Sequence, residues 1–165
     1  AADLVVGGRG NGWKTAMGTL GFERGTAFMA QQLRFAKEFA KVRDLARRKE
    51  LDRDPEIRQR LARAYAELEI MRWSGLRNVT RFIQGGQPGP EGSVGKLFWS
   101  KWHQRLGELE ADLLGADSLL LQPEGSAEHD FQHTFLFSRA HTIYAGSSEI
   151  QRNIIGERAL GLPRG

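Results

Sequence analysis

Near the C-terminus of the chain stands the sequence Thr142-Ile143-Tyr144-Ala145-Gly146-Ser147-Ser148-Glu149-Ile150-Gln151-Arg152. A serine followed by an acidic residue within one turn is typical of a helix start, so we expect Ser147 or Ser148 to cap a final helix. Gly146, just before the cap, allows the backbone to approach a ligand closely. The stretch therefore predicts a glycine loop that leads into a helix, and the start of such a helix can also face a cofactor.

Three long segments upstream of this loop have helical spacing. We expect the first helix to run to about Arg48. Its apolar residues recur at three- and four-residue steps: Trp13, Ala16, Met17, Leu20, Ala27 and Ala30. Asp54 and Pro55 indicate the start of a second helix, which ends near Gln84 and has an inward stripe of Ile57, Leu61, Ala64, Leu68 and Met71. After a Gly- and Pro-rich loop at 85–92, a third helix should turn six residues inward: Val94, Leu97, Phe98, Leu106, Leu109 and Leu113.

The remaining segments complete an all-α prediction. Residues 129–141 suggest a short helix, and the final helix should stop at Gly161 and Pro163. Strand-like alternation is essentially missing, so the default is an up-down four-helix bundle with additional short helices. Residues 1–11 read as the end of a preceding β domain and a linker, and residues 12–165 as the helical domain.

Composition narrows the function classes. The 165 residues carry a net charge of +4 and no Cys, which excludes disulfides and thiolate metal sites and fits a cytoplasmic protein. Basic and acidic residues alternate, so we expect no nucleic-acid partner, and no apolar run is long enough for a membrane span. His129 and His133 lie four apart, but no familiar ligand signature surrounds them, so no metal is expected and the tryptophans and histidines read as packing, interface or surface residues.

Glu23 lies on the apolar stripe of the first segment, between Leu20 and Ala27. A carboxylate on a buried face is costly unless it is paired, and desolvation raises its pKa toward the range that a general base needs. A plain ion pair, for example with Arg24, explains the same pattern, and on the pattern alone it is favoured.

The stretch 142–152 resembles the active-site loop of acyl-CoA dehydrogenases, in which Ile-Tyr-Glu-Gly-Thr-Ser-x-Ile-Gln is usual and the Glu is the catalytic base. Here that position is Ala145. The stretch Gly12–Arg24 is similar to the first helix of the family's C-terminal domain. The isovaleryl-CoA and long-chain branches carry their base at the position of Glu23 and a small residue in the loop, and this chain has both features.

The resemblance implies an FAD-dependent α,β-desaturation of an acyl-CoA, with Glu23 as the base and electron-transfer flavoprotein as the acceptor. The backbone N–H of Ala145 is expected to polarise the thioester oxygen. Substrate binding is implied for Arg24, Tyr144 and Gly146, and flavin binding for Ser147 and Glu149. The family's N-terminal and middle domains supply much of both pockets, so the 165 residues alone are expected to be inactive and to belong to a homo- or hetero-oligomer.

Two family motifs that hold flavin are missing, which keeps other functions open. Phe35–Ala40 stands where Arg-x-x-Phe-Gly is usual, and Leu114–Ser118 where Gly-Gly-x-Gly is often found. The alternatives are a non-catalytic assembly subunit of a mixed oligomer, a flavin-dependent monooxygenase or oxidase on the same fold, and a plain helical interaction module. The acyl chain is not specified by the sequence.

Overall fold

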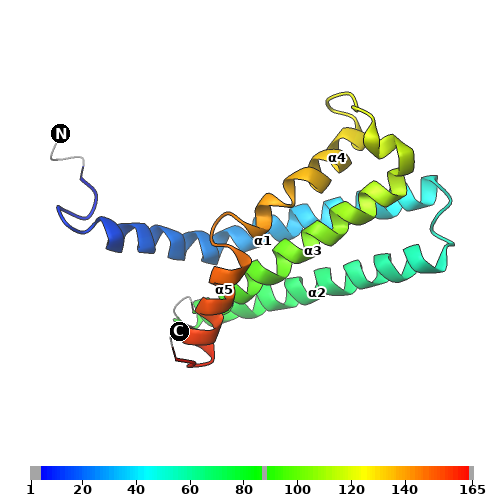
Figure 1. The fold of residues 1–165 in the computed structure, drawn as a ribbon. Helices are drawn as coiled ribbons and strands as arrows, with labels where there is room; N and C mark the ends of the chain where they lie inside the picture. The colour runs from blue at the N-terminus through cyan, green and yellow to red at the C-terminus, as the bar shows by residue number, and fades with distance from the viewer. Residues whose placement is uncertain (1–4, 87–88, 164–165) are drawn as a thin grey trace.

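A computed structural model describes residues 5–86 and 89–163 of the chain, and for residues 20–29 it describes the backbone alone. Every regular element in these ranges is helical. Four helices pack side by side (Figure 1): α1 (Gly12–Arg48), α2 (Pro55–Ile83), α3 (Glu91–Leu114) and α4 (Ala127–Phe137). The shorter elements are the 3-10 helices η2 (Gly115–Leu119) and η3 (Ala140–Thr142), helix α5 (Ser148–Ile154) and a π-helical turn, η4 (Ile155–Ala159). The predicted all-α bundle is confirmed.

The start of α2 follows from its local sequence. The side chain of Asp54 accepts hydrogen bonds from the backbone N–H groups of Glu56 at 2.9 Å and Ile57 at 3.0 Å. Pro55, which has no N–H to satisfy, stands at the first helical position. The expected cap is therefore confirmed, and it fixes where the chain reverses between α1 and α2.

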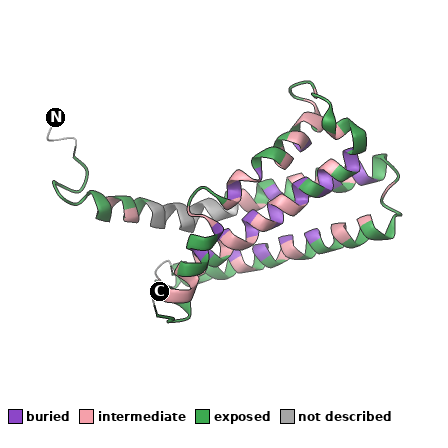
Figure 2. Ribbon diagram, viewed as in Figure 1, coloured by how far each residue is buried: buried purple, intermediate pink, exposed green. Residues whose placement is uncertain are grey.

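Helix α1 contributes to the core only in its second half. Its buried side chains begin at Phe35 and continue with Phe39, Val42, Leu45 and Ala46. The prediction of an inward stripe from Trp13 and Ala16 is wrong, because Trp13 is 80% exposed and Ala16 is also exposed. The reason is length: 37 residues of α-helix span about 55 Å, and the N-terminal part of α1 extends beyond the bundle (Figure 2).

Helix α3 is the most buried element and contacts each of the other long helices. Its core residues pack against those of α1 and α2, and the indole Nε1–H of Trp102 donates to the backbone oxygen of Ala64 at 2.9 Å. Leu106, Leu109 and Leu113 are buried as predicted, but Val94 is exposed because the inward face at this end of α3 is formed by Ser93 and Lys96. Of the tryptophans, Trp99 and Trp102 are in the core, whereas Trp13 and Trp73 are exposed.

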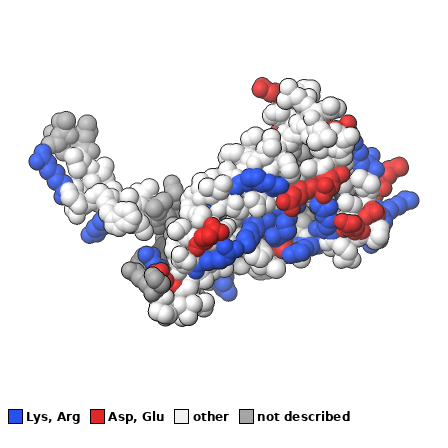
Figure 3. All heavy atoms as spheres, in the orientation of Figure 1, with Lys and Arg blue, Asp and Glu red and all other residues white. Residues whose placement is uncertain are grey.

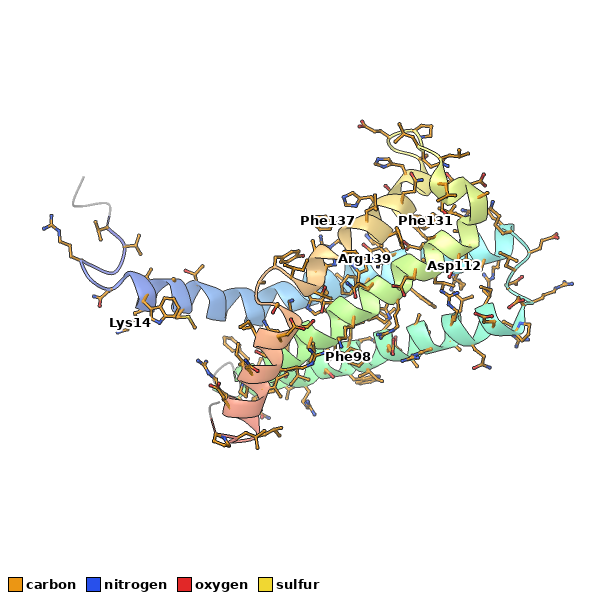
Figure 4. All side chains as sticks on the ribbon, in the orientation of Figure 1. Lys14, Phe98, Asp112, Phe131, Phe137 and Arg139 are labelled. Carbon is orange, nitrogen blue, oxygen red and sulfur yellow. The ribbon has the colours of Figure 1, made fainter. Side chains whose placement is uncertain are left out.

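Gly107 sets the distance between α3 and α4. A Cβ added there would lie 2.8 Å from the backbone Cα of Phe135, too close for any side chain. The absence of a side chain lets α4 lie directly on α3, where Phe131 joins the core while Phe137 is exposed on the same helix (Figure 4). The predicted short helix at 129–141 is confirmed, with bounds of Ala127 and Phe137.

The surface carries both charge signs. On the face shown in Figure 3, Lys and Arg side chains are interspersed with Asp and Glu over the bundle. Cross-helix ion pairs include Arg105 with Glu67 at 2.8 Å and Arg60 with Asp112 at 2.7 Å. Within the described ranges, no helix is long and apolar enough to cross a membrane.

Replacing Leu106 by Ala should lower the free energy of unfolding by about 2–5 kcal/mol, because the side chain is 1% exposed and its loss leaves a cavity between α3 and its neighbours. Leu121→Ala is the matched control: Leu121 is 97% exposed, and its truncation should change stability by less than about 0.5 kcal/mol. Urea denaturation followed by circular dichroism measures both values. Equal effects would contradict the assigned core.

Candidate functional site

The loop between η3 and α5 bends through two consecutive residues with positive φ. Ala145 has a φ of 52° and Gly146 a φ of 92°. Ser147 then caps α5, its hydroxyl accepting a hydrogen bond from the N–H of Ile150 at 3.5 Å. The predicted glycine loop and serine cap are both present, and of the two candidate serines Ser147 is the cap. We call residues 143–147 the Ala145 loop.

A buried lysine from α3 fastens the Ala145 loop to the bundle. The Lys96 side chain is 7% exposed, and its Nζ donates to two backbone oxygens, those of His141 and Gly146, at 2.8 Å each. Burial lowers the pKa of the Lys96 ammonium, and the nearby charge of Glu149 opposes that shift. The ammonium therefore joins the turn before the loop to the loop itself.

A glutamine from α5 holds the same loop from the other side. Gln151 is 0% exposed, and its Nε2 donates to the backbone oxygens of Ala145 at 2.9 Å and Gly146 at 3.3 Å. A Cβ at Gly146 would lie 2.5 Å from this nitrogen. The close approach that Gly146 permits within the described residues is thus to Gln151.

Two backbone donors of the loop are unused by the described residues. Within the described part of the chain, the N–H groups of Ala145 and Gly146 have no protein acceptor. Ala145 itself is exposed, and its methyl group is the only side-chain atom at this bend. The loop thus presents free amide donors beside a small side chain, the kind of arrangement that stabilises a developing oxyanion.

The other loop residues named from the sequence lie around these donors. Tyr144 is half-exposed, and its ring packs edge-on against that of His141, with 5.4 Å between the ring centroids. Burial raises the pKa of its phenol. Glu149 is exposed and pairs with Arg152 at 3.3 Å; a backbone hydrogen bond, followed by one from Ser147, lowers the pKa of its carboxyl. The side chains of Glu23 and Arg24 lie outside the described residues, so their roles stay predictions.

Two buried histidines connect the loop to α1. The Nδ1 atoms of His103 and His141 are 2.8 Å apart, and Nε2 of His103 is 2.9 Å from Oε2 of Glu38. A carboxylate only accepts, so Nε2 of a neutral His103 donates to Glu38, and Nδ1 of His103 then accepts the proton of His141. Burial lowers the pKa of His141 to about 4, and the positive charge of Lys96 acts in the same direction.

The histidine prediction is refined by this arrangement. His103 and His141 are packing residues with specific polar partners, whereas His129 and His133 are partly or fully exposed on α4. No group of three potential ligands that could hold a metal ion occurs among the described residues. Lys96 and Gln151 were missed as site residues, although Ser93, Lys96, Ser100 and His103 form an inward stripe of polar or small residues at helical spacing.

A polar cavity of about 170 Å³ lies where α1, α3 and α4 meet. Glu38, Lys41, Glu110 and Asp130 contribute to its lining, and Lys41 pairs with Asp130 at 2.9 Å. Glu110 is fully buried, and its Oε2 has no partner among the described residues. Burial raises the pKa of Glu110 well above its usual range, and the charge of Glu38 adds to this shift.

The sequence model of a protein family, the acyl-CoA dehydrogenase C-terminal domain, matches residues 10–160. The chain belongs to the acyl-CoA dehydrogenase family. It is 46% identical over 169 residues to the acyl-CoA dehydrogenase IpdE1 of Mycobacterium tuberculosis (strain ATCC 25618 / H37Rv), covering 99% of this chain and 41% of that protein. It is 48% identical over 163 residues to IpdE1 of Mycolicibacterium smegmatis (strain ATCC 700084 / mc(2)155), covering 99% and 40%.

A solved structure shares the acyl-CoA dehydrogenase fold. The structure titled "Tcur3481-Tcur3483 steroid ACAD" superposes with a TM-score of 0.80 at 24% identity, covering 93% of this chain and 40% of that one. The ChsE4-ChsE5 complex from Mycobacterium tuberculosis gives a TM-score of 0.65 at 25% identity, covering 79% and 36%. The chain spans about two fifths of the length of the two IpdE1 proteins that it matches.

Acidification should weaken the acyl-CoA dehydrogenase domain through His141. Its folded pKa of about 4 lies below the ordinary value of 6.5, so the unfolded state binds more protons, and stability is lost as the pH falls from 6.5 toward 4. The loss attributable to His141 is on the order of 2–3 kcal/mol. Urea denaturation of wild type and His141→Gln across this range measures it: the variant should have the flatter pH dependence, and parallel curves would contradict the assignment.

Replacing Gly146 by Ala should destabilise the domain by about 1–3 kcal/mol, because Cβ is strained at a φ of 92° and lies 2.5 Å from Nε2 of Gln151. Gly10→Ala is the control for the strain alone, since its φ is 82° and nothing lies within 4 Å of the added Cβ. The difference in unfolding free energy between the two variants reports the contact with Gln151. No difference would show that Gln151 gives way freely.

Proposed function

We propose that this chain is the C-terminal domain of an FAD-dependent acyl-CoA dehydrogenase that forms a double bond between the α and β carbons of an acyl thioester. The observation that carries the proposal is the Ala145 loop: outward amide donors at a bend with a methyl side chain, where the family usually has its catalytic Glu. The loop therefore has the backbone N–H groups that would polarise a thioester, but it lacks the carboxylate that the family usually has there. A base elsewhere is then required, and Glu23 is the residue that the sequence offers.

In the proposed reaction the N–H of Ala145 donates to the thioester oxygen, which acidifies the α proton. The carboxylate of Glu23 accepts that proton, so the α C–H bond breaks as its electrons form the new double bond. FAD, when bound, supplies the oxidant that receives the hydride from the β carbon. Electron-transfer flavoprotein is proposed as the acceptor of the electrons.

The chain's own residues fit one edge of such a flavin site. The Ser147 hydroxyl, the outward N–H groups and the exposed carboxylate of Glu149 lie on the same loop and helix start. Two cavities among the described residues lie elsewhere: one is the polar cavity where α1, α3 and α4 meet, and the other, of about 430 Å³, lies between α1 and α2. We propose that the N-terminal and middle domains of a longer protein, and a neighbouring subunit, complete the flavin and acyl-CoA pockets.

An assembly subunit of a mixed oligomer is the second candidate. The solved relative ChsE4-ChsE5 is by its title a complex of two different proteins. The segment 35–40, where the family usually binds flavin, places Phe35 and Phe39 in the core and turns Glu38 toward His103. In this case a partner chain would supply the flavin contacts.

The test compares wild type and Glu23→Gln in the longer flavin-loaded protein, by stopped-flow reduction of the flavin with short, branched, long-chain and steroid-derived acyl-CoA thioesters. Loss of the base should slow reduction by about 10²–10⁴-fold while flavin and acyl-CoA still bind. Glu124→Gln, an exposed loop residue, is the matched control and should leave the rate unchanged.

Each other outcome points to a rival. A wild-type protein that holds flavin but is reduced by no acyl-CoA overturns the dehydrogenase proposal and favours a monooxygenase or oxidase. A protein without flavin favours the assembly subunit. Unchanged reduction in Glu23→Gln means that another group is the base.

A further inference from the structure

We propose that Lys96 and Gln151 are positioning residues that aim the amide groups of the Ala145 loop at the thioester oxygen, and that the Lys96 ammonium adds positive charge behind them. The proposal deepens the dehydrogenase function and rests on it. Neither residue need touch the substrate, since both act on the loop backbone from its inner side.

Peptide planarity explains how an inner contact aims an outer donor. In a trans peptide, the C=O and the following N–H point in opposite directions. Gln151 holds the carbonyl of Ala145 inward, so the N–H of Gly146 points outward. Lys96 holds the carbonyl of Gly146 inward in the same way and thereby turns the N–H of Ser147 outward.

The second hydrogen bond of Lys96 fixes the segment that leads into the loop. Its Nζ also holds the carbonyl of His141, three residues before Tyr144, at 2.8 Å. The His141 ring is itself fixed by His103 and by an edge-on contact with Trp99 at 5.0 Å between ring centroids. One ammonium therefore holds the chain at His141 and again at Gly146, and the N–H of Ala145 belongs to the short segment between these two anchored carbonyls.

The charge of Lys96 is unusual for its position. Its side chain is 7% exposed, and the two hydrogen bonds of its Nζ go to backbone carbonyls, while the charge of Glu149 acts on it from nearby. A buried cation whose direct hydrogen-bond partners are carbonyls is costly, because dipolar carbonyls compensate only part of its desolvation. Negative charge that develops on a thioester oxygen at the loop would be attracted to this ammonium, so the cost is recovered in the transition state.

The position of Lys96 on α3 gives the loop a rigid support. Ser93 and Ser100, one turn away on either side, are fully buried, and Trp99 packs in the core. A displacement of about 1 Å at a reacting group can lower a rate about 10²-fold. An anchor on the most buried helix keeps the amide donors within that tolerance.

The experiment uses the complete flavin-loaded protein with Lys96→Met, Gln151→Met and, as the matched control on the same helix, Lys101→Met. Methionine is unbranched and close to both side chains in length, and it removes their donors. Four quantities are measured: flavin content, the Kd for acyl-CoA, the rate constant of flavin reduction at saturating acyl-CoA, and hydrogen–deuterium exchange of residues 143–148.

We expect Lys96→Met to lower the reduction rate constant by about 10–100-fold with flavin content and Kd nearly unchanged. Exchange in residues 143–148 should become faster, and Gln151→Met should show a smaller change in both quantities. Lys101→Met should stay within about twofold of wild type in every measurement. A residue that served folding alone would lower flavin content and binding together with the rate.

Several results overturn the proposal. A flavin-loaded Lys96→Met protein whose rate constant stays within about twofold of wild type does so directly. Should Lys96→Met not fold, the same criterion applied to Gln151→Met decides. If wild type itself is not reduced by acyl-CoA, the dehydrogenase function fails, and unchanged loop exchange in both variants then shows separately that they do not hold the loop.

Discussion

The two hydrogen bonds of the Lys96 ammonium to backbone oxygens are the interaction on which the candidate site depends. A charged donor in a buried setting makes stronger hydrogen bonds than a neutral one, and here both acceptors belong to the segment that forms the site. The bend at Ala145 and Gly146 has two positive φ values, and such a conformation persists only where its surroundings over-determine it. Lys96 from α3 and Gln151 from α5 supply that constraint, while the Ser147 cap fixes the next helix.

Support for this interaction extends through the bundle. Helix α3 is held in place by the packing of Trp102, Leu106 and Leu109 against α1 and α2, and by the close contact with α4 that Gly107 permits. This packing keeps Lys96 turned inward. The same helix carries His103, which joins Glu38 on α1 to His141 beside the loop. Apolar packing therefore positions the polar groups, and the polar groups position the loop.

The sequence predicted the helices and their caps better than it predicted which helix faces are buried. Asp54 with Pro55, the glycine loop and the serine cap are local signals, and each appears where expected. Periodicity failed at Trp13 and Val94, because spacing tells which residues share a helix face but not whether another element covers that face. Lys96 was missed for a related reason: its partners are backbone oxygens about 45–50 residues away, and carbonyls carry no sequence signal.

The two groups of the proposed chemistry stand on parts of the chain that are supported differently. The Ala145 loop is fastened to a core that the chain builds alone, whereas the stretch of α1 before Phe35 has no buried side chain among its described residues. That stretch also contains Gly18, Gly21 and Gly25, each of which costs a helix interior about 1 kcal/mol relative to Ala. Its helical order must come from whatever packs on it. Under the proposed function, assembly would then decide when the Glu23 position is presented to the loop, so that no proton is removed before the flavin is enclosed.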